Sequence, residues 1–306
     1  VMDDGCLGAR ACLDAVKPAW DAAVAAGNPV GMGLGLKNSG LGNGANEVSR
    51  STVRFDPDGT IEVRHCWTEM GQGIHTVARQ VAVEELGVEP DRIKVVVDTT
   101  RELGAGQTTG SRGTVMGAGS VADACRNAMA GGCEEDVEYE GVYVVDWTNS
   151  INDGLENPVI HSTFGYAAQL VELDSETGEI AKVVAAHDVG RAVNPLLCEG
   201  QIEGAVHMGL GYALTEGFPC DEHGKPLNET LRSLDIIRPK DMPPTEVILV
   251  ESPDPNSPYG IKGVGEIGLV PTAGAVAAAL HAHDGEWRHE LPMRTERNRE
   301  RASAWS

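Results

Sequence analysis

The chain has 306 residues, 41% of them hydrophobic, which suffices for one large or two smaller domains with a sizeable core. Its 24 basic and 46 acidic side chains give a formal net charge of −22, which argues against nucleic acid as a partner. The sequence contains no apolar run long enough to span a membrane, and its first residues show no signal-peptide pattern.

The seven cysteines are widely spaced and form no C-x-x-C pair. This spacing favours reduced thiols over a disulfide framework. It also argues against an iron–sulfur cluster or a structural zinc ion held by this chain. We therefore expect a cytoplasmic protein.

The order of hydrophobic periods and turn signals predicts an α+β fold, because hairpins alternate with helices. In the first half we expect a helix over 7–26 that is interrupted near Pro18, a strand from 28 leading into a polar glycine-rich loop, a hairpin over 51–66, a helix after 73, a buried strand over 93–98 and a helix after 113. In the second half we expect a strand over 142–147, a hairpin over 164–188, a helix that Asn194 caps, a strand over 246–252, a helix over 272–283 and a polar tail over 286–306. A shift in composition near 130–160 suggests two α+β subdomains, 1–140 and 141–306.

Three glycine-rich loops lead into helices, at 71–73, 108–113 and 263–266. Helix N-termini attract anionic or electron-rich ligands, and glycine lets a backbone approach a ligand closely. Taken singly, each loop is more typical of an ordinary helix cap than of a ligand site. The helix after Asn194 adds five glycines between 200 and 217, which makes sense if something packs closely on its backbone.

The third loop lies in KGVGEIGLVPTAG, over 262–274, and holds one carboxylate, Glu266, among glycines and apolar residues. A buried carboxylate is costly unless it is paired, hydrogen-bonded or neutralised, and proteins tolerate that cost where the carboxylate acts as a base. The alternative is a turn in which Glu266 points into water.

Together and in this order, WTEMGQGIHT, TTGSRGT, HDVGRAVNP with EGQIEG, and KGVGEIGL resemble one family over residues 10–295. They are similar to the C-terminal half of the molybdenum-cofactor-binding subunit of the xanthine dehydrogenase/aldehyde oxidoreductase family, the molybdenum hydroxylases. LGLKNSGLGNG and TTRELGAGQTTGSRGT look most like the bacterial selenium-dependent purine or xanthine hydroxylases.

The resemblance implies a molybdopterin cofactor, in its cytosine dinucleotide form, whose molybdenum is held by the pterin and not by protein side chains. Glu266 matches the catalytic base of a hydroxylation that inserts water-derived oxygen at an electron-poor carbon of a purine or related N-heterocycle. The positions that match cofactor-binding residues are Gln72, Gly73, Thr109, Gly110, Ser111, Arg112, Gln201, Gly263 and Gly265. A dry, glycine-lined pocket is expected around Glu266.

The resemblance covers only part of such a subunit, because no GGGFGG-type loop and no substrate-gripping aromatic and arginine region occur in this sequence. It therefore implies a partner subunit that carries the first half of the molybdenum domain, and further subunits that carry FeS and FAD. Two alternatives stay open: an aldehyde or nicotinate-type hydroxylase subunit, and a truncated remnant or scaffold without activity. A nicotinamide-dependent dehydrogenase is disfavoured, because no strand–GxGxxG–helix unit is present.

Other polar residues near these motifs have weaker claims. Lys37 and Asn38 are candidates for the substrate entrance, and Lys262 for steadying an anionic cofactor or substrate, against plain solvent exposure. His75 is expected to pack or cap rather than bind metal. The pair 187–188 should point to opposite faces of a strand, which favours a structural role.

Overall fold

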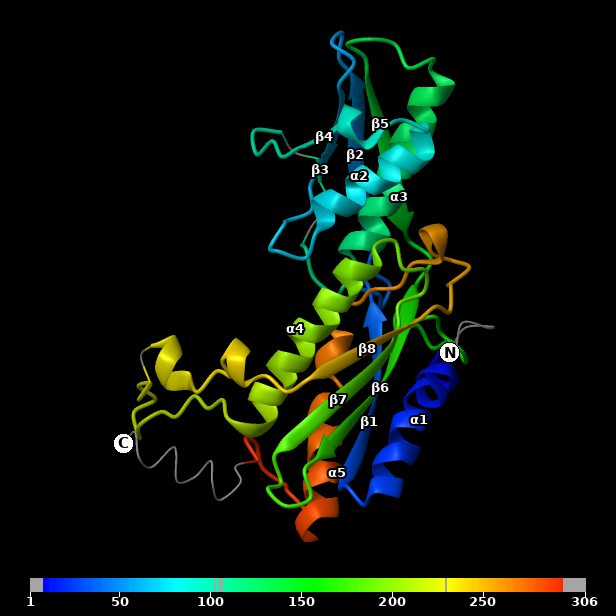
Figure 1. Ribbon diagram of the computed structural model, residues 1–306. Helices are drawn as coiled ribbons and strands as arrows, with labels where there is room; N and C mark the ends of the chain where they lie inside the picture. The colour runs from blue at the N-terminus through cyan, green and yellow to red at the C-terminus, as the bar shows by residue number, and fades with distance from the viewer. Residues whose placement is uncertain (1–7, 102, 105–106, 229, 294–306) are drawn as a thin grey trace.

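The computed structural model describes residues 8–101, 103–104, 107–228 and 230–293. Eight strands within these ranges form two four-stranded sheets, which lie one above the other in Figure 1. Sheet 1 has the order β4 (Ile93–Val96), β3 (Ile61–His65), β2 (Glu47–Phe55) and β5 (Glu138–Val145). Sheet 2 has the order β1 (Val30–Ser39), β6 (Thr163–Leu173), β7 (Ile180–Asp188) and β8 (Thr245–Val250). Neighbouring strands are antiparallel except for the parallel pairs β3–β4 and β7–β8.

Helices cover both sheets (Figure 1). They are α1 (Ala9–Ala26), α2 (Ile74–Leu86), α3 (Gly113–Ala130), α4 (Pro195–Leu214) and α5 (Thr272–Asp284), with short 3₁₀ helices η1 (Pro90–Arg92), η2 (Leu231–Leu234), η3 (Pro239–Asp241), η4 (Pro258–Gly260) and η5 (Ile267–Leu269). None of the helices in the described part of the chain is both long and apolar enough to cross a membrane. The predicted α+β fold is confirmed.

The apolar core follows from this layering. In sheet 1 one cluster lies between the strands and helices α2 and α3. Sheet 2 carries a cluster on each face, because α1 packs on one face and α4 and α5 pack on the other. Strand β6 lies inside sheet 2 and is buried on both faces, which explains why its sequence is a nearly continuous apolar run.

Two local expectations are wrong. The first helix continues through Pro18, because the stripe of Cys12, Val16 and Ala23 is buried against sheet 2 and this packing outweighs the lost backbone hydrogen bond. Strand β4 is shorter than expected and buries only Ile93, because it lies at the edge of sheet 1. The predicted tail over 286–306 falls largely outside the described residues.

The sheets draw on distant parts of the sequence. Strand β1 pairs with β6 along its whole length, and β5, which spans residue 140, pairs with β2. Sheet 1 therefore draws its strands from residues 47–145, whereas sheet 2 combines β1, near the start of the chain, with strands that follow residue 162. The division at residue 140 stays a prediction about folding units.

Candidate functional site

Three loops that are far apart in the sequence meet where the two sheets adjoin. They are the end of β1 with the turn after it, the loop before α3, and the loop before η5. Three hydrogen bonds join them: Gly40 N to Gly110 O (2.8 Å), Gly263 N to Ser39 Oγ (2.9 Å) and Glu266 N to Ser111 Oγ (3.0 Å). A Cβ atom added to Gly263 would overlap Ser111 O and Ser39 Oγ, so only glycine fits there. The structure thus brings together predicted site residues from two of the three glycine-rich loops.

Glu266 lies at this junction, but it is neither buried nor alone. Its side chain is 45% exposed, and its Oε2 lies 2.7 Å from Nζ of Lys37. The expectation of a dry pocket around Glu266 is wrong for this chain, because the loop turns the side chain outward beside a cation. Of the two candidates for the substrate entrance, Lys37 contacts the carboxylate, and its Nζ also donates to the carbonyl oxygen of Asn38 at 3.0 Å.

The loop at 71–73 leads into α2, and its N–H groups already have an acceptor. The carboxylate of Glu69 accepts from Gly71 N at 2.8 Å and from Gly73 N at 2.9 Å. The amide of Gln72 closes the same loop, since Nε2 donates to Thr68 O at 2.7 Å. Glu69 therefore serves as the intrinsic anion at this helix N-terminus.

His75, in the first turn of α2, bears out the expected packing role. Its Nδ1 lies 2.9 Å from Nε2 of His65, and the two rings are 4.9 Å apart. Burial, together with the neighbouring imidazole, lowers the pKa of His65 from 6.5 to about 4. Among the described residues, no group of three or more His, Cys, Asp or Glu side chains is arranged to hold a metal ion.

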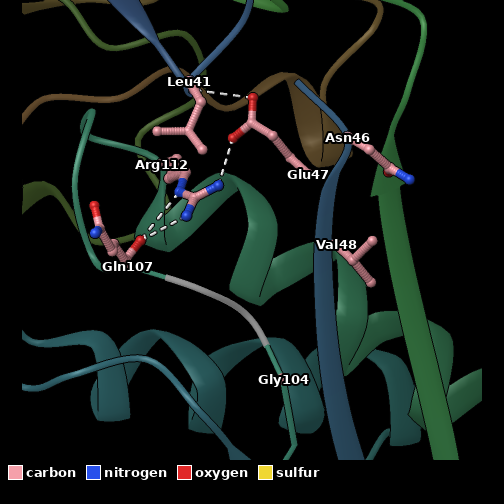
Figure 2. Close-up of a pocket in the computed structure, with 7 residues that line it drawn as sticks. All are labelled: Leu41, Asn46, Glu47, Val48, Gly104, Gln107 and Arg112. Carbon is pink, nitrogen blue, oxygen red and sulfur yellow. Dashed lines mark hydrogen bonds and ion pairs between the residues drawn. The ribbon is translucent and has the colours of Figure 1, made fainter. Parts of the chain in front are cut away.

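Arg112 is the N-cap residue of α3 and is almost completely buried together with Glu47, the first residue of β2 (Figure 2). Its NH1 donates to Oε2 of Glu47 at 2.7 Å, and its NH2 donates to Gln107 O at 2.7 Å. The other oxygen of Glu47 accepts from the backbone N–H groups of Leu41 and Gly42. This pair therefore ties the turn after β1 to the start of α3.

A pocket of about 410 Å³ lies over this pair. Its lining residues are Leu41, Asn46, Glu47, Val48, Gly104, Gln107 and Arg112 (Figure 2). Glu266 is not among them. The pocket therefore adjoins one cofactor-binding candidate, Arg112, and not the candidate base.

The first turns of α4 reach the loop at 71–73. Asn194 caps α4 as predicted, since its Oδ1 accepts from Leu197 N at 3.0 Å. Leu197 packs on Gly73 so closely that a Cβ atom there would overlap its side chain. Gln201, one turn further along α4, is half-buried.

Lys262 and Asp188 form a buried ion pair beneath the loop before η5. Nζ of Lys262 lies 2.6 Å from Oδ2 of Asp188, and both side chains are 0% exposed. The hypothesis that Lys262 faces an anionic ligand is wrong, because a carboxylate of the chain itself occupies that position. As expected, His187 points to the other face of β7, where its Nε2 lies 3.1 Å from Gln169 Nε2.

The sequence did not reveal two carboxylates that hold these loops, Glu69 at the loop over 71–73 and Glu47 beside Arg112. Glu69 stands two residues before Gly71, and an acid just ahead of a helix start is a local signal that was available. Glu47 carried no such signal, because its cation, Arg112, is distant in the sequence.

Comparison with known proteins decides the family. The molybdopterin cofactor-binding domain family matches residues 11–133 and 128–243. This chain belongs to that family. The resemblance to the molybdenum hydroxylases is confirmed.

Individual relatives agree with the family match. Subunit gamma of the 6-hydroxypseudooxynicotine dehydrogenase complex of Paenarthrobacter nicotinovorans is 30% identical, over 88% of this chain and 39% of the relative. The probable hypoxanthine oxidase of Escherichia coli (strain K12) is 28% identical, over 85% of this chain and 31% of the relative. The structure of the aldehyde oxidoreductase from Desulfovibrio gigas has the same fold, with a TM-score of 0.82 at 24% identity, over 97% of this chain and 36% of that one. The chain thus spans between about a third and two fifths of the length of these relatives.

Proposed function

We propose that this chain is the molybdopterin-binding part of a multi-chain oxidoreductase that hydroxylates an electron-poor carbon of a purine or related N-heterocycle, with Glu266 as the base. The observation that carries the proposal is the junction of the three loops, which fixes the backbone of Glu266 through the Ser111 hydroxyl. One relative supports a purine substrate, because it is named for hypoxanthine, whereas the relative named for a nicotine derivative fits the nicotinate-type alternative.

The residues of this chain fit an organic cofactor better than a bare ion. Gly71, on the loop before α2, and Gly200 and Gly204, on α4, have no atom within 4 Å of the place where a Cβ would lie, so a ring system could approach their backbone. The amide of Gln201 offers both a donor and an acceptor on α4, whereas the amide of Gln72 is bonded to Thr68 O and Met70 N and shapes the loop. When bound, the cofactor would supply the redox and oxygen-transfer chemistry.

We propose the cytosine dinucleotide form of molybdopterin, held by nine residues on the loops and on α4. They are Gln72, Gly73, Thr109, Gly110, Ser111, Arg112, Gln201, Gly263 and Gly265. Arg112 would act through the shape of its loop, since its guanidinium group is already bonded to Glu47 and Gln107. Glu266 is accessible at the junction and would take a proton there.

The exposed face of α4 supports the proposal that another chain or segment covers this side. Leu196, Met208 and Tyr212 are each more than half exposed, although α4 is mostly apolar, with Glu199, Gln201, Glu203 and His207 as its polar side chains. A helix of that kind is typical of a buried position. We propose that the first half of a molybdenum domain packs here, that partner subunits carry FeS and FAD, and that the assembly works in the cytoplasm.

The test is turnover of the native complex with Glu266→Gln, assayed against xanthine, hypoxanthine, nicotinate and an aldehyde. Loss of the base should lower turnover by about 10²- to 10⁴-fold, while the metal content per chain stays unchanged. Glu246→Gln is the matched control, because that carboxylate lies exposed on β8 beside Lys182. Full turnover of Glu266→Gln would overturn the proposal, and oxidation of the aldehyde alone would replace its substrate class.

A further inference from the structure

Lys37 sits beside Glu266, and its ammonium group contacts both that carboxylate and Asn38. Nζ lies 2.7 Å from Oε2 of Glu266, and it donates to the carbonyl oxygen and to Oδ1 of Asn38 at 3.0 and 3.2 Å. An ammonium group has three N–H donors, and two of them go to Asn38, while Glu266 pairs with the charge of the group. The side chain is only 27% exposed, which distinguishes it from a freely moving surface lysine.

The backbone that carries Lys37 is held on both sides. Lys37 and Asn38 are near the end of β1, where they pair with Gly165 and Phe164 of β6. Nδ2 of Asn38 donates to Gly40 O at 3.1 Å and lies 3.2 Å from Nδ1 of His161. The ammonium group is thus fixed by a strand and by the same turn that bonds to the loop before α3.

His161 completes this arrangement. Burial, with a further contribution from the charge of Lys37, lowers the pKa of His161 below its ordinary value. The imidazole is therefore neutral at pH 7, and its Nδ1 can accept a hydrogen bond from Asn38. A protonated ring would instead repel both the Asn38 amide hydrogens and the Lys37 ammonium group.

The carboxylate of Glu266 is held at one oxygen only. In the part of the chain that the structure describes, its ion pair is with Lys37 through Oε2, and Oε1 has no partner. A carboxylate held at one oxygen keeps a fixed orientation while the other oxygen stays available for a proton. We infer that Lys37 is a positioning residue for Glu266, which it holds in the orientation that a proton-accepting base needs. The inference rests on the proposed function of Glu266.

If Lys37 served only to stabilise the fold, its removal would lower the free energy of unfolding. The ion pair is partly exposed, and such pairs contribute little to stability. The positioning role therefore predicts that removal of the ammonium group leaves the free energy of unfolding nearly unchanged and lowers the catalytic rate. A small displacement of a base is enough to lower the rate of the chemical step strongly.

The first experiment compares Lys37→Met and Lys37→Arg in the native complex. Lys37→Met should lower kcat by on the order of 10- to 100-fold, with KM changed by less than about threefold, because orientation is lost while binding remains. Lys37→Arg, which keeps a cation, should recover most of kcat. Lys182→Met, at an exposed pair on β7, should match the wild type, and metal content should be the same in all variants.

The second experiment does not need turnover. Acylation of lysine amines, followed by mass spectrometry, should modify Lys37 about two- to fivefold faster in Glu266→Gln than in the wild type, because the variant loses the ion pair. The rate at Lys182 should not change and serves as the internal reference. Equal rates at Lys37 in both proteins would overturn the inference even if no activity were obtained.

The experiments can refute the role of Glu266 as the base and the positioning role of Lys37 independently of each other. If Glu266→Gln keeps full turnover, the proposed base is wrong. If Glu266→Gln abolishes turnover but Lys37→Met keeps the wild-type kcat, Glu266 stands as the base and the positioning role of Lys37 is wrong.

Discussion

Replacing Lys262 with methionine removes the cation from an ion pair that water does not reach. Asp188 would keep its bond from Gly190 N at 3.0 Å but would lose the ammonium group that lies 2.6 Å from its other oxygen. Burial already raises the pKa of Asp188, against the opposing effect of Lys262. Without that effect, the carboxylate must either stay charged in an apolar site or take up a proton, and both cost free energy.

The distance sets the magnitude. Two unit charges 2.6 Å apart attract by about 6 kcal/mol at an effective dielectric constant of ~20. Part of this attraction offsets the cost of removing both groups from water, so the loss of one partner costs about 3–5 kcal/mol. For a chain of this size, that cost corresponds to a fall in Tm on the order of 10 °C.

Denaturant and thermal unfolding of the chain measure this cost. Lys182→Met is the matched control, because its partner Glu246 is exposed, and we expect a change within about 0.5 kcal/mol. The double variant Lys262→Met/Asp188→Asn should recover part of the loss, since no charge is left buried. A loss below about 1 kcal/mol in Lys262→Met, equal to that of the control, would refute the reasoning.

Two further predictions concern the pH dependence of the free energy of unfolding and the close packing around Gly263. Burial is the main cause that lowers the pKa values of His65 and His187 from 6.5 to about 4, so the unfolded chain binds protons more readily than the folded one. Each histidine therefore contributes about 3 kcal/mol of stability that is present above pH 6.5 and is lost as the pH falls toward 4. The free energy of unfolding against pH should flatten in this window in His65→Gln but not in His223→Gln, whose ring is exposed. Gly263→Ala should cost about 1–3 kcal/mol and lower metal retention, because its methyl group overlaps neighbouring atoms, whereas Gly274→Ala has open space and should stabilise α5 by about 0.5–1 kcal/mol. Equal unfolding midpoints for the two alanine variants would contradict the packing at the junction.

Local patterns predicted most elements, because period and turn chemistry act over a few residues. The hairpin of β6 and β7 and the Asn194 cap of α4 follow from such signals. The pairing of β1 with β6 could not be predicted this way. It depends on packing between segments that are far apart in the sequence, and no local signal specifies the partner strand.

The candidate site shows the same division. Its glycine-rich loops could be found from the sequence, and Gly263 is required by a contact that the structure now explains. The surroundings of Glu266 could not be predicted from the sequence, because its partner Lys37 lies more than 200 residues earlier in the chain. Charged groups at a loop junction find their partners only when the fold assembles, so the sequence predicted a dry, glycine-lined pocket around Glu266, whereas its side chain is 45% exposed.

The most direct measurement of the central claim is molybdenum and cytidine nucleotide per chain, after the chain is purified with its native partners. The proposed function predicts nearly one molybdenum and one cytidine nucleotide per chain, together with a large co-purifying partner. A chain that purifies alone, well folded and with neither group, would contradict it and would leave a scaffold or remnant without catalytic activity.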